Sequence, residues 1–137
     1  MTDRNIQEIK VKSFFKDDSF RQIVLYSGRS RMDLVPSNID NLEPYSINES
    51  EKVNYCERLT YCIAKAISKC KEERRKPFQT ILILTYLKCI PTNEVKETIG
   101  YKPSQFWKLK RQAQQEFAMY FNHYKDKYDI DKTFKLI

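Results

Sequence analysis

Apolar residues recur every three or four positions through much of the chain after residue 47, and this spacing predicts helices rather than strands. The first run predicts a long amphipathic helix over 48–76, with one apolar stripe that packs against a core. Asn48 and, three positions later, Glu51 are residue types that cap the start of a helix. The stripe consists of Val53, Cys56, Leu59, Ile63, Ala66, Ile67 and Cys70.

Two shorter helical patterns follow, separated by a break at Ile90-Pro91. The first, over 77–89, begins at Pro77, which suits the first turn of a helix because its missing N–H would have no helical partner there. The second covers 92–99. Both are short, so each needs packing against a neighbour to be stable.

Gly100 marks a sharp turn before the last helix. Glycine readily adopts the left-handed backbone conformation that ends many helices, and Pro103 can open the next one. We expect this helix over 103–122, with the glycine turn between it and the helix over 92–99. The overall prediction is a mainly α fold, a helical bundle in which residues 77–122 form a helix-turn-helix.

Residues 1–46 have a weaker pattern. A short helix can begin at Asp3, whereas 21–27 is β-prone, so the segment is compatible with a short hairpin or with a loosely attached arm. The stretch 35–46 contains two prolines and several Asn, Ser and Asp residues, which is typical of a linker. We therefore separate an N-terminal segment over 1–46, of unknown role, from a helical domain over 47–137.

The positive charge of the chain is unevenly distributed. Residues 1–46 contain seven basic and seven acidic residues, so the entire net charge of +7 lies in 47–137. One cluster, 65–76, has six basic and two acidic residues; another, 102–111, has four basic residues and no acidic one. Such an asymmetry predicts that the basic part binds a polyanion.

The helix that begins at Pro103 has two contrasting faces when it is drawn with 3.6 residues per turn. One face suits a hydrophobic core and the other a charged groove. The second helix of a helix-turn-helix enters the DNA major groove with its N-terminal half, so this helix is the candidate recognition helix. Its apolar face holds Phe106, Leu109, Ala113 and Phe117, and its polar face holds Ser104, Lys108, Arg111 and Gln115.

Position on this helix assigns the expected contacts with bases. Ser104, Gln105 and Lys108 lie on its first turns and are expected to reach base edges, where Gln reads adenine and Lys reads guanine. Trp107 has two interpretations. It either shields the groove or a sugar, or it packs on the helix over 92–99.

Three further cations are expected to contact the DNA backbone. Lys102, Lys110 and Arg111 are placed to bind phosphates. Such contacts increase affinity and its dependence on salt without reading sequence.

The residue types argue against a metal site and against catalysis. The four cysteines include no Cys-x-x-Cys pair and His123 is the only histidine, so we expect reduced thiols, no bound metal and no cofactor. A Gly-rich phosphate loop and clustered carboxylates are absent from the sequence, so we expect no catalytic residues and no enzyme activity. The sequence contains neither a membrane-length apolar run nor a signal peptide, which predicts a cytoplasmic protein without a membrane partner.

The stretch CIPTNEVKETIGYKPSQFWKLKRQAQQEFA resembles the region 4 helix-turn-helix of sigma factors. Over roughly 48–122 the chain resembles more closely the ArpU-like and RinA-like regulators of late transcription in phages of Gram-positive bacteria. The resemblance implies an activator of late genes for packaging, morphogenesis and lysis. It also implies binding near a promoter, together with host RNA polymerase, in the nucleoid of the host cell. It assigns recognition to Ser104, Gln105, Trp107 and Lys108.

The resemblance leaves residues 1–46 uncovered, and the chain is too short for a complete sigma factor. Two alternatives remain open. A phage small terminase subunit also combines a helix-turn-helix with an oligomerising helix, and it would form a ring. A helical inhibitor of a host factor would bind protein and show no salt-dependent binding to DNA. A homo-oligomer is compatible with the regulator and is required for the terminase.

Overall fold

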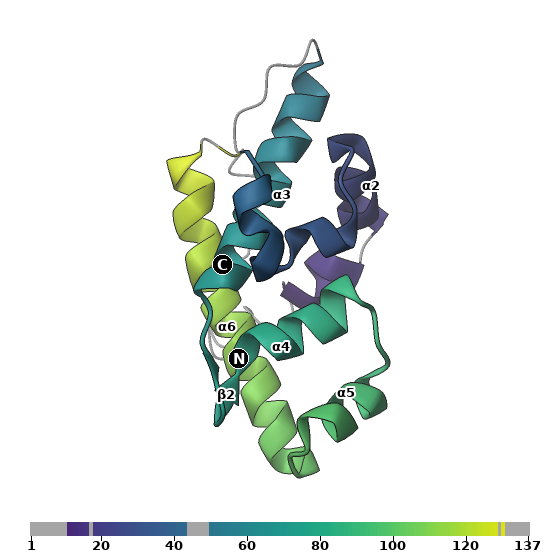
Figure 1. Ribbon diagram of the computed structural model, residues 1–137, viewed down its shortest axis with the longest axis vertical. Coiled ribbons are helices and arrows are strands. Elements are labelled where there is room, and N and C mark those ends of the chain that lie inside the picture. The colour runs from purple at the N-terminus through teal and green to yellow at the C-terminus, as the bar shows by residue number, and fades with distance from the viewer. Residues whose placement is uncertain (1–10, 17, 44–49, 129, 131–137) are drawn as a thin grey trace.

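The computed structural model describes residues 11–16, 18–43, 50–128 and 130, and these are mainly helical (Figure 1). Two long helices, α3 and α6, pack against each other and form the centre of the molecule, α2 packs on α3, and α4 packs on α6. The prediction of a mainly α helical bundle is confirmed. In chain order the elements are a helical segment over 11–16, α2 (Asp18–Ser27), 3-10 helices η1 (Arg31–Leu34) and η2 (Pro36–Asn41), α3 (Glu51–Lys69), strands β1 (Glu72–Glu73) and β2 (Lys76–Pro77), α4 (Phe78–Leu82), π-helix η3 (Ile83–Leu87), α5 (Thr92–Ile99) and α6 (Pro103–Lys127).

Helix α3 differs from its prediction at both ends. Ser50 caps its N-terminus by accepting a hydrogen bond from the Val53 N–H at 3.4 Å, whereas the expected cap, Asn48, lies outside the described residues. The helix ends at Lys69, so the predicted extension to residue 76 is wrong. The apolar stripe itself stops at Cys70, and the charged residues that follow have no apolar face to bury.

The N-terminal segment is helical where strand or hairpin structure was expected. Residues 21–27 belong to α2, so the β interpretation of this stretch is wrong. Phe20, Ile23 and Val24 are buried at helical spacing on the face that packs against α3. Tertiary burial therefore overrides the local preference of the β-branched residues for a strand.

Two arginines connect the segment after α2 to the rest of the molecule through hydrogen bonds. Arg29 donates hydrogen bonds to the Glu57 carbonyl at 2.7 Å and to Thr60 Oγ1 at 2.8 Å, both on α3. Arg31 donates to the Tyr86 carbonyl at 2.7 Å. Residues on both sides of the expected boundary near residue 46 share one hydrophobic core, so residues 11–43 are not a loosely attached arm.

The helices between residues 78 and 127 begin and end close to most of their predicted bounds. Helix α4 continues into η3, and Cys89 adopts a left-handed φ of 55° just before the expected break at Ile90-Pro91. Pro77 precedes α4 as the last residue of β2 rather than being its first helical residue. Helix α5 has the expected bounds, and Gly100 ends it with φ 82°.

Helix α6 begins at Pro103 as expected and continues to Lys127, beyond the predicted end near residue 122. The apolar face identified from the sequence is buried: Phe106, Leu109, Ala113 and Phe117 all lie in the interior. Tyr124 continues the buried face of the helix, and its backbone carbonyl accepts a hydrogen bond from the Cys62 thiol of α3 at 3.5 Å. Packing on α3 explains why the helix extends further than its apolar stripe suggested.

Truncating Phe117 should strongly destabilise the protein. Its ring is fully buried and lies 5.2 Å from that of Phe15 and 5.7 Å from that of Phe121, measured between centroids. We expect Phe117→Ala to lower the free energy of unfolding by about 3–5 kcal/mol, because it removes apolar contacts and leaves a cavity. Urea titration followed by circular dichroism measures the change. The control is Met119→Ala, whose side chain is 53% exposed and whose loss should cost less than about 0.5 kcal/mol; equal effects of the two variants would contradict the assigned packing.

Candidate nucleic-acid interface

The start of α6 presents the expected polar residues on the surface. Ser104, Gln105 and Lys108 are all exposed, and Lys102, the residue just before the helix, is exposed as well. The Lys102 carbonyl accepts the first helical hydrogen bond, from the Phe106 N–H at 2.9 Å. The side chains assigned to base edges therefore lie together at one open end of a helix.

Two of the cations expected to bind phosphates differ in their exposure. Arg111 is half-buried, whereas only 8% of Lys110 is exposed. The ammonium group of Lys110 lies 5.1 Å from the centre of the Trp107 ring, within the range of a cation–π interaction. Lys110 therefore lies on a flank of α6, beside Trp107, and not on the outermost face of the helix.

Trp107 is a surface residue. Its side chain is 48% exposed, and its ring makes an edge-to-face contact with Phe106 at a centroid distance of 5.6 Å. Of the two interpretations drawn from the sequence, this exposure favours a residue available at the surface over one packed into α5. The apolar residues that are fully buried here are instead Val95 of α5 and Phe106 of α6.

A short β-hairpin, which the sequence pattern does not predict, lies beside the candidate recognition helix α6. Strands β1 and β2 pair antiparallel, Glu73 opposite Lys76, with Arg74 and Arg75 in the turn (Figure 1). Glu72 accepts hydrogen bonds from both the backbone N–H, at 3.3 Å, and the hydroxyl of Thr80 in α4. The hairpin is thus anchored at the first turn of α4, where a carboxylate is favoured by the helix dipole.

A further hydrogen bond connects the hairpin to the turn before α6. The Tyr101 hydroxyl, in the turn between α5 and α6, donates to the Arg74 carbonyl at 2.6 Å. This bond joins the tip of the hairpin to the turn that starts α6. The cationic tip and the candidate recognition residues are therefore parts of one surface.

Between the hairpin and α6 lies a groove of 550 Å³. Its lining includes three cations and two amides, and none of the described residues that form it is acidic. A surface of this kind attracts phosphate groups and offers hydrogen-bond donors beside them. The lining residues are Arg75, Lys76, Tyr101, Gln105, Lys108, Leu109 and Gln112.

The cations of the hairpin tip belong to the basic cluster over 65–76, but the sequence pattern does not bring them to the same surface as the start of α6. The predicted helix over 48–76 puts Arg74, Arg75 and Lys76 at its C-terminal end, so the hairpin goes unrecognised. The available signal was the lack of any apolar residue between Cys70 and Pro77, which a continuing amphipathic helix would need. The turn itself lacks the Gly or Asn that marks most two-residue hairpins, so the hairpin could not be recognised from its turn.

The cysteines are free thiols, and three of them are buried on α3 or just after it. Burial raises the pKa of the Cys62 thiol to about 12, and burial also raises that of Cys70. Within the described part of the chain, no three Cys, His, Asp or Glu side chains are grouped so that they could hold a metal ion. Nor does any described helix combine the length and apolar character needed to span a membrane.

Replacing Gly100 by alanine should destabilise the turn before α6. Its φ of 82° is unfavourable for any residue with a Cβ, although the space around the new methyl group is open. We expect Gly100→Ala to lower the free energy of unfolding by about 1–2 kcal/mol, and Gly100→Asn to lower it less. Chemical denaturation of both variants tests this; an alanine variant as stable as the parent would show that the turn does not need the left-handed conformation.

Thiol labelling should separate the one exposed cysteine from the three buried ones. At pH 8, raised pKa values keep Cys56, Cys62 and Cys70 protonated and their burial excludes reagent, whereas Cys89 is exposed. We expect one iodoacetamide adduct per native chain, at Cys89, and four after denaturation, counted by mass spectrometry. Two or more adducts formed quickly before unfolding would contradict the packing of α3.

Comparisons with models of protein families, with curated proteins and with solved structures found no match to this chain. The resemblance to sigma region 4 and to phage late regulators therefore stays a prediction from the sequence.

Proposed function

We propose that this protein is a sequence-specific DNA-binding transcriptional regulator that inserts the N-terminal half of α6 into the major groove. The observation that carries the proposal is the exposed, cationic start of α6, which follows a tight glycine turn and lies beside a cationic hairpin. An α-helix with its side chains is about 10–12 Å across, and the major groove is about 12 Å wide. A single helix of this kind therefore fits the groove.

Three side chains have the position and chemistry to read bases. Ser104, Gln105 and Lys108 project from the first turns of α6, the part of a recognition helix that reaches base edges. Gln105 can donate to and accept from adenine, and Lys108 can donate to guanine. Each good contact of this kind contributes about 1–3 kcal/mol of discrimination against the wrong base.

Other cations around these residues suit the phosphate backbone. Lys102 and Arg111 flank the reading residues on α6, and Arg74 and Arg75 extend the positive surface onto the hairpin. Their contribution is electrostatic, so it should raise affinity for any duplex and weaken as salt increases. The hairpin tip is held by Tyr101, which limits the entropy lost when its arginines bind.

The biological role within this function is inferred from the resemblance. We propose an accessory activator of phage late genes that binds near a promoter, in the cytoplasm of a bacterial host, and acts with host RNA polymerase. The tight packing of residues 11–43 against α3 and the core is consistent with a compact regulator rather than a protein with a separate flexible arm.

Removing Lys108 should weaken and relax sequence recognition. The parent protein would first be used to select bound duplexes from a random pool, and the selected duplex would then be compared with a scrambled one by band shift. We expect Lys108→Ala to lose about 1–3 kcal/mol of binding to the selected duplex, with a smaller loss on the scrambled one.

The matched control is Lys102→Ala, which removes one exposed cation from the same end of α6. It should weaken binding to both duplexes alike and lower the slope of log K against log salt by about 1. Equal affinity of the parent for selected and scrambled DNA would rule out the sequence-specific function. Unchanged specificity in Lys108→Ala would mean that another part of the surface reads the bases.

A further inference from the structure

A second cavity, of 390 Å³, lies on the opposite flank of the recognition helix from the hairpin groove. Gln105 and Lys108 line the hairpin groove, whereas Trp107 and Lys110 line this cavity. At 3.6 residues per turn these two sets point roughly half a turn apart around α6. The exposed ridge with Ser104 runs between them.

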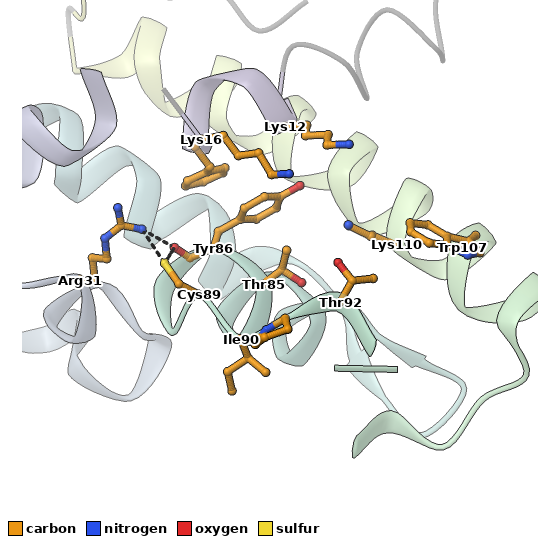
Figure 2. A pocket seen from close by; sticks show the side chains of 12 residues that line it. Lys12, Lys16, Arg31, Thr85, Tyr86, Cys89, Ile90, Thr92, Trp107 and Lys110 are labelled. Carbon is orange, nitrogen blue, oxygen red and sulfur yellow. Dashed lines mark hydrogen bonds between the residues drawn. The ribbon is translucent and has the colours of Figure 1, made fainter. Parts of the chain in front are cut away.

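The cavity is cationic and is assembled from segments far apart in the sequence. Lys12 and Lys16 come from the helical segment over 11–16, Lys110 comes from α6, and Arg31 precedes α3 (Figure 2). None of the described residues that line it is acidic. Four positive charges around one small space repel one another, so the cavity favours an anionic occupant.

One of the four cations is already committed to structure. Arg31 donates hydrogen bonds to the Tyr86 carbonyl at 2.7 Å and to Cys89 Sγ at 3.1 Å, and its guanidinium lies 4.8 Å from the centre of the Phe20 ring. Figure 2 shows Arg31 on the far side of Tyr86 from Trp107. Arg31 therefore shapes one wall, and the three lysines supply the charge at the opening.

Two of the three lysines reach toward the Tyr86 ring (Figure 2). Lys12 and Lys16 are exposed and four residues apart, so they share one face of their helix, and Figure 2 shows Lys16 and Lys110 reaching toward the Tyr86 ring from different sides. The ring itself is fixed, because it stacks on Phe15 at a centroid distance of 4.4 Å and its hydroxyl is hydrogen bonded to Gln114 Nε2. The cavity thus has a rigid floor beneath its ammonium groups.

The start of α5 adds to the same preference. Thr92, its first residue, lines the cavity together with Pro91. The N-terminus of a helix carries a partial positive charge and unpaired N–H groups, which favour phosphate. Lysine ammonium groups and a helix N-terminus are a common combination around phosphate.

We propose that this cavity is a phosphate-binding site completed by Lys12 and Lys16 of the N-terminal segment. This inference rests on the proposed function: the phosphate belongs to the backbone of the bound duplex, on the strand opposite the one that faces the hairpin. A helix in the major groove has one sugar–phosphate backbone on each side, and the hairpin groove and this cavity occupy those two sides. The N-terminal segment then belongs to the DNA interface. A free phosphate-bearing ligand would offer the same chemical group, and the phosphate titration described below distinguishes it from the DNA backbone.

The test removes two charges from the cavity without touching the core. Lys12→Ala/Lys16→Ala would be compared with Lys52→Ala/Lys127→Ala, which removes two exposed cations at the far end of α3 and α6 (Figure 1). Binding to the selected and the scrambled duplex would be measured at several salt concentrations. We expect the cavity variant to lower the slope of log K against log salt by about 2 and to weaken both duplexes by the same factor; the control should bind as the parent does.

A second measurement identifies a free ligand. Trp107 is the only tryptophan of the chain and lines the cavity, so its fluorescence reports occupancy. Inorganic phosphate would be titrated into the parent and the cavity variant, with potassium chloride of equal ionic strength as the reference. A saturable change in the parent that is lost in the variant, together with an unchanged salt slope, would support the site with a free phosphate as its occupant.

An unchanged salt slope together with an unchanged Trp107 signal would overturn the proposal. That result differs from a failure of the proposed function, because Lys108→Ala would still relax the sequence preference if α6 reads DNA. Conversely, the parent could bind all duplexes equally while phosphate changes Trp107 fluorescence only when Lys12 and Lys16 are present. That result would support the phosphate site and contradict the proposed sequence-specific regulator.

Discussion

The burial of one face of α6 is the constraint on which the rest of the molecule depends. Phe106, Ala113 and Phe117 are fully buried along this face. A helix is rigid about its own axis, so burying these residues also determines which side chains face outward. Ser104 and Lys108 are presented at the surface as a consequence of packing on the opposite side. The core and the candidate DNA surface are thus two faces of the same helix.

The groove beside α6 is positive because cations line it and none of the described residues that line it is acidic. The local sequence contains both acids and bases, but Glu72 is held by Thr80 at the start of α4, and Glu116 accepts a hydrogen bond from the Lys71 N–H at 2.8 Å. These two carboxylates therefore make hydrogen bonds within the fold, whereas Arg75 and Lys76 line the groove beside α6. The field at the surface depends on where each charge is placed as well as on the net charge of the segment.

The N-terminal segment is coupled to the same surface through aromatic packing. Phe15 stacks on Tyr86 and contacts Phe117, so the helix over 11–16 is held against η3 and α6. Arg31 adds a hydrogen bond to the Tyr86 carbonyl of η3. A segment whose role was open in the sequence thereby contributes two lysines to one flank of the candidate recognition helix. Stability and the charge of the surface are connected here, because the contacts that bury Phe15 also place Lys12 and Lys16.

The sequence by itself determined the features that depend on neighbouring residues: the bounds of α5, the start of α6, the left-handed turn at Gly100 and the buried face of α6. Each follows from helical spacing or from the conformational freedom of one residue, which act over a few positions. Only the tertiary structure decided that 21–27 is helical and that the chain after Cys70 forms a hairpin. It also decided that the hairpin groove and the second cationic cavity flank α6. Those features require contacts between distant segments, such as α2 with α3 and Tyr101 with Arg74. A local sequence pattern does not indicate which distant surface will bury it.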